Sequence, residues 1–479
     1  WGIDRMKSMI RERADWCISR QRRWGLPIPV FYCADCGKPA CTDETIEAVS
    51  ALFAEKGSNA WFEMDAADIL PKGFACPHCG KSAGFTKEED TLDGWFDSGS
   101  THFAAMKKDQ GFWPATMYLE GLDQYRGWFQ SSLLTAVGAF GEGAPFKECV
   151  THGWTVDGEG RAMHKSLGNG VDPADIFNEN GADILRLWAA SADYHADVRC
   201  SKAIFQQLSQ NYLKFRNTCK FMLDNLVDFD PAHLTKAEDM PVLDRWLITK
   251  LNELIEKVEQ SYNDYEFHII THAVNDFCVT TLSSFYLDIV KDRLYCEAAD
   301  SAERRSAQTA LYLTLSTLAK LFAPILAFTC DEIWLAMPHT AEDDARNVVL
   351  NDMNKPFTAY ALDAETMARW EHIIEVRTAV NGALEEARAS KVIGKSLEAD
   401  VHLTVPEGDV FLADENPAAL ADLFIVSKVE LTVGGELAVK VENAAGTKCP
   451  RCWKHSLTPN AEGLCPRCAE VVRHLPDLL

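Results

Sequence analysis

Four C-x-x-C pairs constrain this 479-residue chain more than any other feature of its sequence. Two such knuckles can bring four thiolates into a tetrahedron, a closed ligand set that suits a structural zinc ion. A small segment with little apolar core can then fold around the metal. We therefore expect two structural zinc sites, one near each end of the chain. The expected ligands are Cys33, Cys36, Cys76 and Cys79 in the first site and Cys449, Cys452, Cys465 and Cys468 in the second.

The surroundings of these pairs support that interpretation. A glycine follows each early pair, and glycine permits the positive φ that a knuckle needs after its second ligand. The long stretch between the early pairs predicts a small helical insertion, "TDETIEAVSALFAEKG". Cys41, His78 and His455 lie nearby, but four cysteines already fill each shell, so we expect them not to bind metal. The other cysteines lie among apolar residues and predict free thiols in a reducing, cytoplasmic compartment.

Composition limits the classes of protein to which the chain can belong. It carries 47 Lys plus Arg and 71 Asp plus Glu, a formal charge of −24, which argues against nonspecific binding to nucleic acid. A local basic surface over residues 1–24 remains compatible with that total. The longest apolar run, 321–328, is far below the ~18 residues of a membrane span and contains Pro324. We expect several globular domains and no membrane partner.

Hydrophobic periodicity divides the chain into distinct parts. Between 91 and 200, runs such as "ATMYLEG" and "KECVTHGWTV" alternate with helical runs such as "ADILRLWAASA", which indicates a parallel α/β unit. Residues 201–340 are nearly all helical in period, and a long helix is expected at about 364–390. The strands "DVHLTV" and "KVELTV" follow. The expected domains are 1–32, 33–90, 91–200, 201–360, 361–445 and 446–479.

The stretch "GRAMHKSLGN" (160–169) places Arg161, His164 and Lys165 on a glycine-rich loop of an otherwise acidic chain. A strand-like run precedes it, and a helix start, "DPADIFNEN", follows. Such a loop can close over a substrate, and its lysine can place a point charge on an oligophosphate. An ordinary hairpin tip can have the same composition, so the loop alone does not decide between the two.

The order of residues in this loop resembles the KMSKS loop of class I aminoacyl-tRNA synthetases, extended as GR-KMSKS-LGN-VDP. In that family the second lysine stabilises charge that builds on the α-phosphate and pyrophosphate of ATP, and we expect Lys165 to do so. The first lysine and first serine of the motif are replaced. Arg161 or a protonated His164 is expected to supply part of the missing charge. The five core positions are Ala162, Met163, His164, Lys165 and Ser166, of which the last four are the expected catalytic residues.

Three further segments carry the same resemblance. "DWCISRQRRWGLPIPVFYC" (15–33) is similar to the segment where the editing insertion returns to the catalytic domain in the isoleucine, valine and leucine enzymes. "GLPIPVFYC" within it favours the isoleucine branch, as does the C-terminal four-cysteine knuckle. "DTLDGWFDSGSTHFA" (91–105) and "YLEGLDQYRGWFQSSLLT" (118–135) resemble stretches that line the family's substrate cleft. The helical part resembles the anticodon-binding domain.

These segments imply the residues of a substrate site. An apolar amino-acid side chain needs an aromatic wall, for which Trp95 and Trp128 are the candidates. Glu120 is expected to contact the aminoacyl-adenylate, and "THGW" (151–154) is expected to lie against the adenine. The residues expected to bind isoleucyl-adenylate or ATP are Trp95, Glu120, Gly121, Asp123, Gln124, Trp128, His152, Gly153 and Lys165.

The resemblance implies a fold and an activity. The expected fold is α/β, a partial Rossmann-like class I catalytic domain, followed by an all-α anticodon-binding helix bundle and a small zinc knuckle. The expected enzyme is a ligase that joins isoleucine to tRNA-Ile through isoleucyl-adenylate, with Mg-ATP as substrate, and is a monomer when complete. Two alternatives remain open, a noncatalytic tRNA-binding module and a valine–tRNA ligase.

One family motif does not occur. The chain contains no H-I-G-H sequence, and only "HIITH" (268–272), inside the helical part, is similar to it. The threonine-rich editing domain of the family does not occur either. Since the H-I-G-H histidines of the family act on the same transition state as the loop lysine, we expect the chain to be the carboxyl-terminal portion of a longer enzyme and inactive alone.

Overall fold

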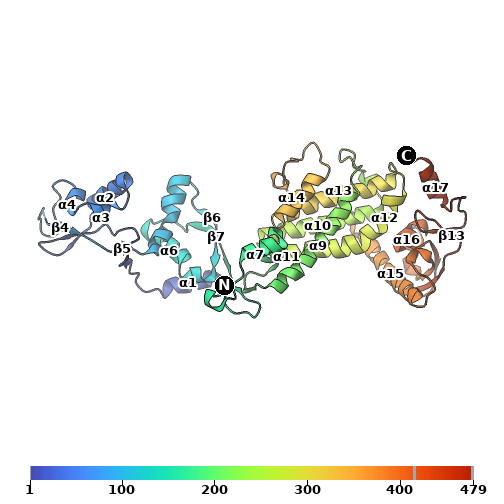
Figure 1. Cartoon of the computed structure of the whole chain (residues 1–479), viewed down its shortest axis with the longest axis horizontal. Coiled ribbons are helices and arrows are strands. Elements are labelled where there is room, and N and C mark those ends of the chain that lie inside the picture. Colours follow the sequence, from blue (N-terminus) through green and yellow to red (C-terminus); the bar gives the residue numbers. More distant parts are fainter. Residues whose placement is uncertain (1, 83, 414–416, 476–479) are drawn as a thin grey trace. The chain divides into compact units, whose positions relative to one another are not determined.

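The computed structural model divides the chain into two compact units (Figure 1). The first unit contains Trp1–Thr155 and Tyr194–Val198, and the second contains Val156–Asp193 and Arg199–Leu479. Within them the structure describes residues 2–82, 84–413 and 417–475. Each unit is described by itself.

The early cysteine pairs of the first unit sit on a small antiparallel sheet. Its strand order is β3-β2-β4, so β2 is the middle strand. Three helices connect β3 to β4. Trp61 of the second helix packs against Phe31 of β2, with the two ring centroids 5.1 Å apart. The elements are β2 (Phe31–Cys33), β3 (Pro39–Ala40), α2 (Asp43–Lys56), α3 (Ala60–Glu63), α4 (Ala66–Ile69) and β4 (Phe85–Lys87).

The helical insertion expected between the cysteine pairs is confirmed. Thr42 caps α2 by accepting a hydrogen bond from the Thr45 backbone N–H, and the helix ends at Gly57, which has φ +77°. Pairing of β2 within its sheet begins at Phe31, after Pro27 and Pro29, because proline has no N–H to donate to a ladder. Pro27 forms only an isolated bridge with Thr91.

The remainder of the first unit is built around a parallel strand pair. β6 (Ala115–Gly121) runs parallel to β7 (Phe146–His152), as the alternating pattern predicted. A parallel pair needs a crossover connection, and α6 supplies it. The other elements are α1 (Gly2–Arg11), β1 (Ser19–Arg20), β5 (Thr91–Leu92), α5 (Gly94–Gly99), η1 (His102–Gln110), η2 (Leu122–Tyr125), α6 (Trp128–Leu134) and η3 (Thr135–Ala139).

α5 and α6 meet where glycine allows a close approach. A Cβ at Gly99 would lie 2.9 Å from the backbone carbonyl carbon of Ser131, a distance that side-chain carbons essentially never show. Thr135, at the end of α6, donates a 2.7 Å hydrogen bond to the Gly99 carbonyl. The two helices that carry the predicted aromatic residues are therefore fixed against each other.

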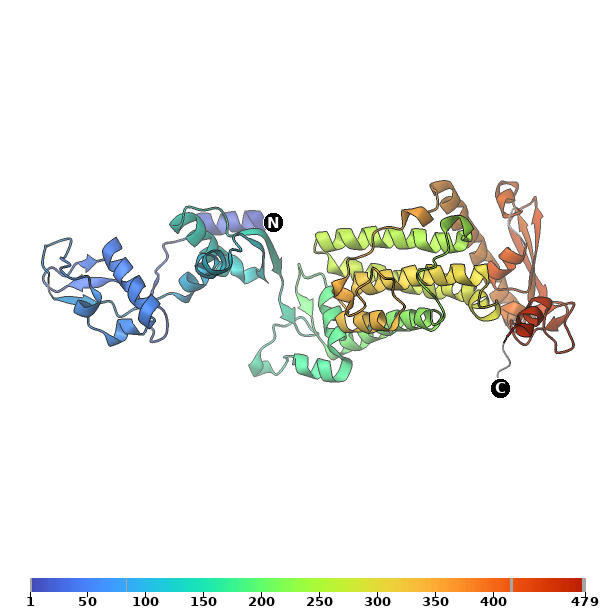
Figure 2. The same cartoon turned by 90° about the horizontal axis from the view of Figure 1, so that it is seen from above.

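The second unit begins with a loop and two helices and continues as a helix bundle (Figures 1 and 2). α13 occupies the core of the bundle, because every residue from 306 to 319 is buried. The elements are β8 (Thr155–Val156), η4 (Lys165–Leu167), α7 (Pro173–Asn180), α8 (Ala182–Ser191), β9 (Val198–Arg199), α9 (Lys202–Asp224), η5 (Ala237–Asp239), α10 (Val242–Asn263), α11 (Phe267–Asp276), η6 (Phe277–Tyr286), α12 (Leu287–Cys296), α13 (Ala302–Phe322) and α14 (Ala327–Ala336).

A small α/β domain follows the bundle. β10 is the middle strand of a three-stranded sheet, parallel to β11 and antiparallel to β12, and its alternate residues are buried. The long helix and both strands predicted from the sequence are confirmed. The elements are η7 (Val348–Leu350), η8 (Thr358–Tyr360), α15 (Ala364–Ala389), η9 (Ser396–Glu398), β10 (Ala399–Val405), η10 (Glu407–Ala413), α16 (Pro417–Phe424), β11 (Lys428–Val433), β12 (Ala438–Asn443), β13 (Thr447–Lys448), β14 (His455–Ser456) and α17 (Pro466–Arg473).

None of the helices in the described part of the chain has the length and apolarity that crossing a bilayer requires.

A buried carboxylate fixes how the bundle helices meet. Asp244 on α10 has no exposed surface. Its oxygens accept hydrogen bonds from the Tyr286 hydroxyl at 2.8 Å, the Ser306 hydroxyl at 2.5 Å and the Arg293 guanidinium at 3.1 Å. A buried charge without such partners costs several kcal/mol. The helices must therefore pack so that all three donors reach the carboxylate.

Replacing this carboxylate should weaken the bundle strongly. Asp244→Ala leaves the Arg293 charge with no partner at this site, and we expect the free energy of unfolding to fall by about 3–5 kcal/mol. Asp224→Ala removes an exposed pair with Lys220 and should cost less than about 0.5 kcal/mol. Urea unfolding monitored by far-UV circular dichroism measures both. Equal effects of the two variants would contradict the account.

Candidate active site and metal centres

The structure brings the four early cysteines together. Their sulfurs all lie within 4.8 Å of one another, with Cys33 Sγ 3.6 Å from Cys79 Sγ. Gly37 and Gly80, which follow the second cysteine of each pair, have φ values of +67° and +75°. Each donates its N–H to the carbonyl of the pair's first cysteine and closes a tight turn. The predicted role of the two glycines is confirmed.

The four late cysteines form a second cluster of the same size. Cys452 Sγ lies 3.7 Å from Cys465 Sγ, and all four sulfurs again lie within 4.8 Å. Trp453 stands where the early knuckles have glycine, and it adopts φ +66°, a strained conformation for a large side chain. It donates its N–H to the Cys449 carbonyl at 2.9 Å, so the turn is the same. The second cysteine pair begins α17.

In each cluster one thiol has a lowered pKa, while neighbouring thiols such as Cys79 and Cys452 have raised ones. Burial opposes ionisation of Cys76, but the backbone N–H groups of His78 and Cys79 outweigh it and lower the pKa of Cys76 to about 6. Burial also opposes ionisation of Cys449, but the backbone N–H groups of Cys452 and Cys465 outweigh it and lower the pKa of Cys449 to about 6. Four thiols at this spacing could hold a soft divalent metal ion.

Two arginines join the late cluster to the bundle. Arg451 and Arg467 are the third residues of the two Cys-Pro-Arg-Cys sequences. Arg467 forms a two-pronged ion pair with Asp292 at 2.5 and 2.8 Å and a further pair with Glu297 at 2.7 Å. Arg451 donates to the carbonyls of Cys296 and of its neighbour, which end α12. Such carbonyls have no partner within their own helix, and cations stabilise that end.

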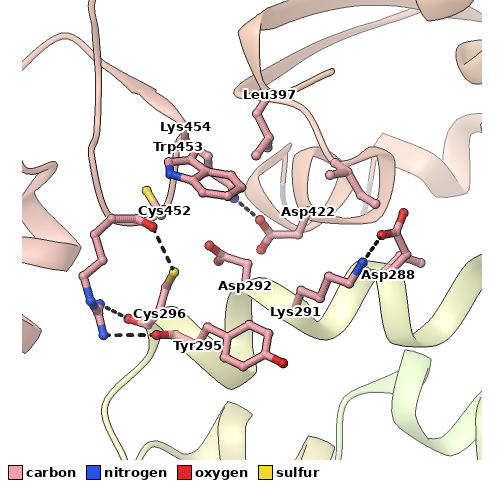
Figure 3. Close-up of a pocket in the computed structure, with 13 residues that line it drawn as sticks. Asp288, Lys291, Asp292, Tyr295, Cys296, Leu397, Asp422, Cys452, Trp453 and Lys454 are labelled. Carbon is pink, nitrogen blue, oxygen red and sulfur yellow. Dashed lines mark hydrogen bonds and ion pairs between the residues drawn. The ribbon is translucent and has the colours of Figure 1, made fainter. Parts of the chain in front are cut away.

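A cavity of about 530 Å³ lies where α12, the α/β domain and the late knuckle meet. Figure 3 shows Trp453 and Lys454 on the knuckle side, with Lys454 paired to Asp422 of α16. Asp292 and Cys296 of α12 lie on the opposite side. The knuckle therefore meets α12 through the ion pairs of Arg467 as well as through the buried Cys296, which packs with Cys449, Cys452 and Leu464.

Arg467→Ala should loosen the knuckle without emptying its cluster. The ion pairs of Arg467 are partly buried, so their loss should cost on the order of 2 kcal/mol of local stability. We expect faster tryptic cleavage within 446–475 with metal content unchanged. Arg473→Ala, on the exposed side of the same helix, is the matched control and should behave like the wild type. Unchanged proteolysis of the Arg467 variant would refute this role.

In the first unit, several predicted binding residues meet at the carboxyl ends of the parallel strands. Gly121 ends β6 opposite His152, which ends β7. A Cβ at Gly121 would lie 2.9 Å from Asp123 Oδ1 and 3.6 Å from His152 Cε1, so both side chains lie directly over the glycine. Gln124 donates a 2.9 Å hydrogen bond to Asp123. Glu120 is exposed at the same end. Ligands of α/β sheets bind at this edge.

Gly153 also marks a close approach of two backbones. A Cβ there would lie 2.4 Å from the Ala196 carbonyl oxygen, and the Gly153 N–H donates to the Tyr194 carbonyl at 2.8 Å. No side chain other than hydrogen fits this position. The segment 194–198 therefore lies against the strand end.

The two predicted aromatic residues, Trp95 and Trp128, both lie beside Gly127. A Cβ at Gly127 would lie 3.0 Å from the tip of the Trp95 ring and 2.5 Å from Gln124 Oε1. Gln124 accepts the backbone N–H of Trp128 at 3.0 Å. The Trp128 ring stacks on Tyr118 with centroids 4.1 Å apart and donates its indole N–H to the Ser98 carbonyl at 3.0 Å. These contacts fix Trp128, whereas Trp95 is 44% exposed.

Trp95 lines a cavity of about 340 Å³ between the β1–β2 connection and α5. Asp97 also lines it, and its Oδ1 atom is buried without a hydrogen-bond partner in the described structure. Burial, and then the nearby Asp93 carboxylate, raise the pKa of Asp97. The motif "DGWFDSG" contains this residue, but sequence reasoning did not single it out, because an acidic residue alone is also typical of a solvated surface or a helix cap.

The predicted catalytic residues lie in the second unit, on the loop between β8 and α7. Lys165 begins the short helix η4, and Gly168 ends it in the left-handed conformation with φ +61°. Met163 is half-buried and packs against the core that contains Ile176 and Phe205. His164, Lys165 and Ser166 are exposed. Among the described residues, Lys165 has no ion pair, so its charge is available to a ligand.

The structure corrects one expectation for this loop. Arg161 was one of two residues, with a protonated His164 as the other, expected to supply part of the charge missing from the motif. Its guanidinium instead pairs with Asp157, at 2.8 Å, and with Glu159. The Asp157 side chain, the stronger of these two partners, raises the pKa of Arg161. Two carboxylates thus neutralise the cation, and its role is to shape the loop.

Sequence reasoning missed the residues that hold this loop. Asp157 is 6% exposed and accepts hydrogen bonds from both the backbone and the side chain of Arg161. Asn169 donates to Asp157 at 2.9 Å and to the Ala162 carbonyl at 3.1 Å. The signal was present in "VDGEG", because an aspartate followed by glycine often accepts the N–H groups of its own turn.

Comparison with known proteins establishes the class. Residues 1–201 match the family model of class I tRNA synthetases (I, L, M and V), and residues 244–403 match that of the anticodon-binding domain of tRNA ligases. The chain therefore contains a class I tRNA synthetase domain followed by an anticodon-binding domain. The family and fold class inferred from the sequence are therefore confirmed.

Within this class, the chain is similar to proteins named isoleucine–tRNA ligase. That of Moorella thermoacetica is 48% identical over 99% of this chain and 53% of its own length. That of Carboxydothermus hydrogenoformans is 49% identical over 100% of this chain and 53% of its own length. The chain thus spans about half the length of the curated relatives it matches.

A solved structure shows the same fold at low identity. It is the ternary complex of Agrobacterium radiobacter K84 agnB2 LeuRS with tRNA and LeuAMS. The two folds superpose with a TM-score of 0.54 and 18% identity, over 90% of this chain and 46% of that one.

Proposed function

We propose that this chain serves in an isoleucine–tRNA ligase, which activates isoleucine with Mg-ATP to isoleucyl-adenylate and transfers it to tRNA-Ile. The observation that carries the proposal is the 48% identity to proteins of that name over nearly the whole chain. Binding of small molecules also needs a suitable site. The residues at the carboxyl ends of β6 and β7 offer one, and the loop that carries Lys165 offers another. The monomeric state expected from the sequence remains part of this proposal.

The first-unit residues suit an aminoacyl-adenylate. Trp128 is held rigidly and Trp95 borders a cavity, so their rings offer apolar walls to an aliphatic side chain. The carboxylates of Glu120 and Asp123 can accept hydrogen bonds from an ammonium group or a ribose. In this proposal Gln124 orients Asp123, and Gly121, His152 and Gly153 let a nucleotide approach the strand ends.

Lys165 has the chemistry for the activation step. When the isoleucine carboxylate attacks the α-phosphorus of ATP, negative charge builds on the α-phosphate and on the departing pyrophosphate. An exposed ammonium group on an ordered loop stabilises such charge more in the transition state than in the ground state. Met163, His164 and Ser166 are proposed to complete this loop, with Met163 anchoring it to the core.

Lys165→Ala should slow adenylate formation by about 10²–10³, because it removes one electrostatic contact to the transition state. Single-turnover formation of isoleucyl-adenylate by the protein as its gene encodes it measures this. Lys202→Ala, which removes an exposed lysine paired with Glu179, is the matched control and should leave the rate unchanged. Ala162→Lys should change it little. A rate unaffected by Lys165→Ala would refute the assignment.

The metal in both cysteine clusters is proposed to be zinc. Four thiolates with no open position form a closed set that fits structural zinc, and neither cluster has the free coordination site of a catalytic metal. All sixteen cysteines are free thiols in the structure, which supports a reducing compartment, and we propose the cytoplasm.

Metal analysis tests this assignment directly. Purified protein should contain about two zinc ions per chain, one for each cluster. Cys79→Ser and Cys465→Ser should each lower the content to about one, because a cluster of three thiolates binds more weakly. Cys41→Ser, beside the first cluster but outside it, should retain both ions. Inductively coupled plasma mass spectrometry gives the count. An unchanged count in either ligand variant would show that the cluster was misassigned.

The partner of the helix bundle is proposed to be tRNA-Ile. Residues 244–403 match an anticodon-binding domain, and this match supports the proposal. Binding of tRNA-Ile by the encoded protein, without isoleucine-dependent exchange of pyrophosphate into ATP, would instead favour a noncatalytic tRNA-binding module.

A further inference from the structure

Side-chain hydrogen bonds close the loop from 157 to 169, together with a backbone hydrogen bond from Asp157 to Arg161 and the packing of Met163 against the nearby core. Asp157 Oδ1 accepts the backbone N–H groups of Glu159 at 3.0 Å and of Arg161 at 2.9 Å. Its Oδ2 accepts the Arg161 side chain at 2.8 Å and the Asn169 amide at 2.9 Å. One carboxylate therefore takes four hydrogen bonds, and the last of them joins the beginning of the loop to its end.

Asn169 completes the closure at its other atom. Its Oδ1 accepts the backbone N–H of His164 at 3.0 Å, and its Nδ2 also donates to the Ala162 carbonyl. The amide is thus bonded to the residues on both sides of Met163. The residue immediately after His164 is Lys165, whose own side chain has no partner in the described structure. The position of the Lys165 backbone therefore follows from where Asn169 is held.

We propose that Asp157 and Asn169 are positioning residues: they fix the internal shape of the 157–169 loop, so that the loop presents Lys165 in one orientation, and catalysis needs this lock. This inference rests on the proposed function only through the role of Lys165. Arg161, which is tied to two carboxylates, belongs to this lock. The lock uses only backbone atoms of Ala162 and His164, and this explains why the loop tolerates these two side chains.

The order of the loop can be measured without any activity. In Asn169→Ala, the His164 N–H loses its acceptor, and hydrogen–deuterium exchange of the peptide covering 157–169 should accelerate at least about tenfold. The melting temperature should stay unchanged, because the loop is exposed. Glu159→Gln is the matched control and should exchange like the wild type, since its carboxylate pairs with Arg161 from the solvent side. Unchanged exchange in Asn169→Ala would overturn the lock.

The coupling to Lys165 is tested by a double-mutant cycle. Asn169→Ala should lower kcat for isoleucine-dependent pyrophosphate exchange about 10-fold or more, with KM for isoleucine unchanged. In the Lys165→Ala background it should have no further effect, because the lock would then hold nothing that acts. Fully additive losses would overturn the proposal.

Asp157→Asn tests the other end of the lock. It replaces one carboxylate oxygen with an amide nitrogen, which cannot accept the hydrogen bonds that Arg161 and Asn169 donate to Asp157. Hydrogen–deuterium exchange of the peptide covering 157–169 should accelerate in this variant too, with a normal melting temperature. Unchanged exchange would contradict the lock. If the encoded protein shows no exchange activity at all, the proposed function fails, and hydrogen–deuterium exchange still decides whether the lock exists.

Discussion

The loop that carries Lys165 has little apolar surface of its own, so its shape depends on the carboxylate of Asp157. That carboxylate is 6% exposed and accepts four hydrogen bonds. The Asn169 side chain is the largest of the contributions that lower the pKa of Asp157, and the others come chiefly from Arg161. The carboxylate thus stays ionised at neutral pH. A loop ordered in this way can present a free lysine without giving that lysine any structural task.

Buried or partly buried ion pairs and hydrogen bonds also fix other parts of the second unit. Asp183 on α8 accepts the first N–H groups of α14, at 2.7 Å from the Thr329 nitrogen, where the helix dipole favours an anion. Asp244 joins three helices of the bundle, and Arg467 joins the late knuckle to α12. Apolar packing gives these elements their stability, and the buried charges select one arrangement of them.

Much of this organisation could be predicted from the sequence, because it depends on local patterns. The glycines of the early knuckles, the helix between them and the strand "ATMYLEG" follow from turn chemistry and periodicity. The sequence could not show that Arg161 is neutralised, because it does not reveal that the buried Asp157 and the exposed Glu159 both face its guanidinium. Nor could it show that Trp453 adopts a glycine-like φ, because tertiary packing overrides intrinsic preference there. Residues that hold other residues, such as Asp157 and Asn169, were not predicted, whereas the residues that were predicted have chemistry of their own.

The central claim is that this chain serves the activation of isoleucine, and amino-acid specificity tests it most directly. The measurement is exchange of labelled pyrophosphate into ATP by the protein as its gene encodes it, with isoleucine, valine and leucine compared at equal concentrations. The account predicts the highest kcat/KM for isoleucine, with valine lower by about 10–200-fold because a pocket distinguishes one methylene by only ~1–3 kcal/mol. A preference for valine or leucine, or no exchange with any of the three, would contradict it.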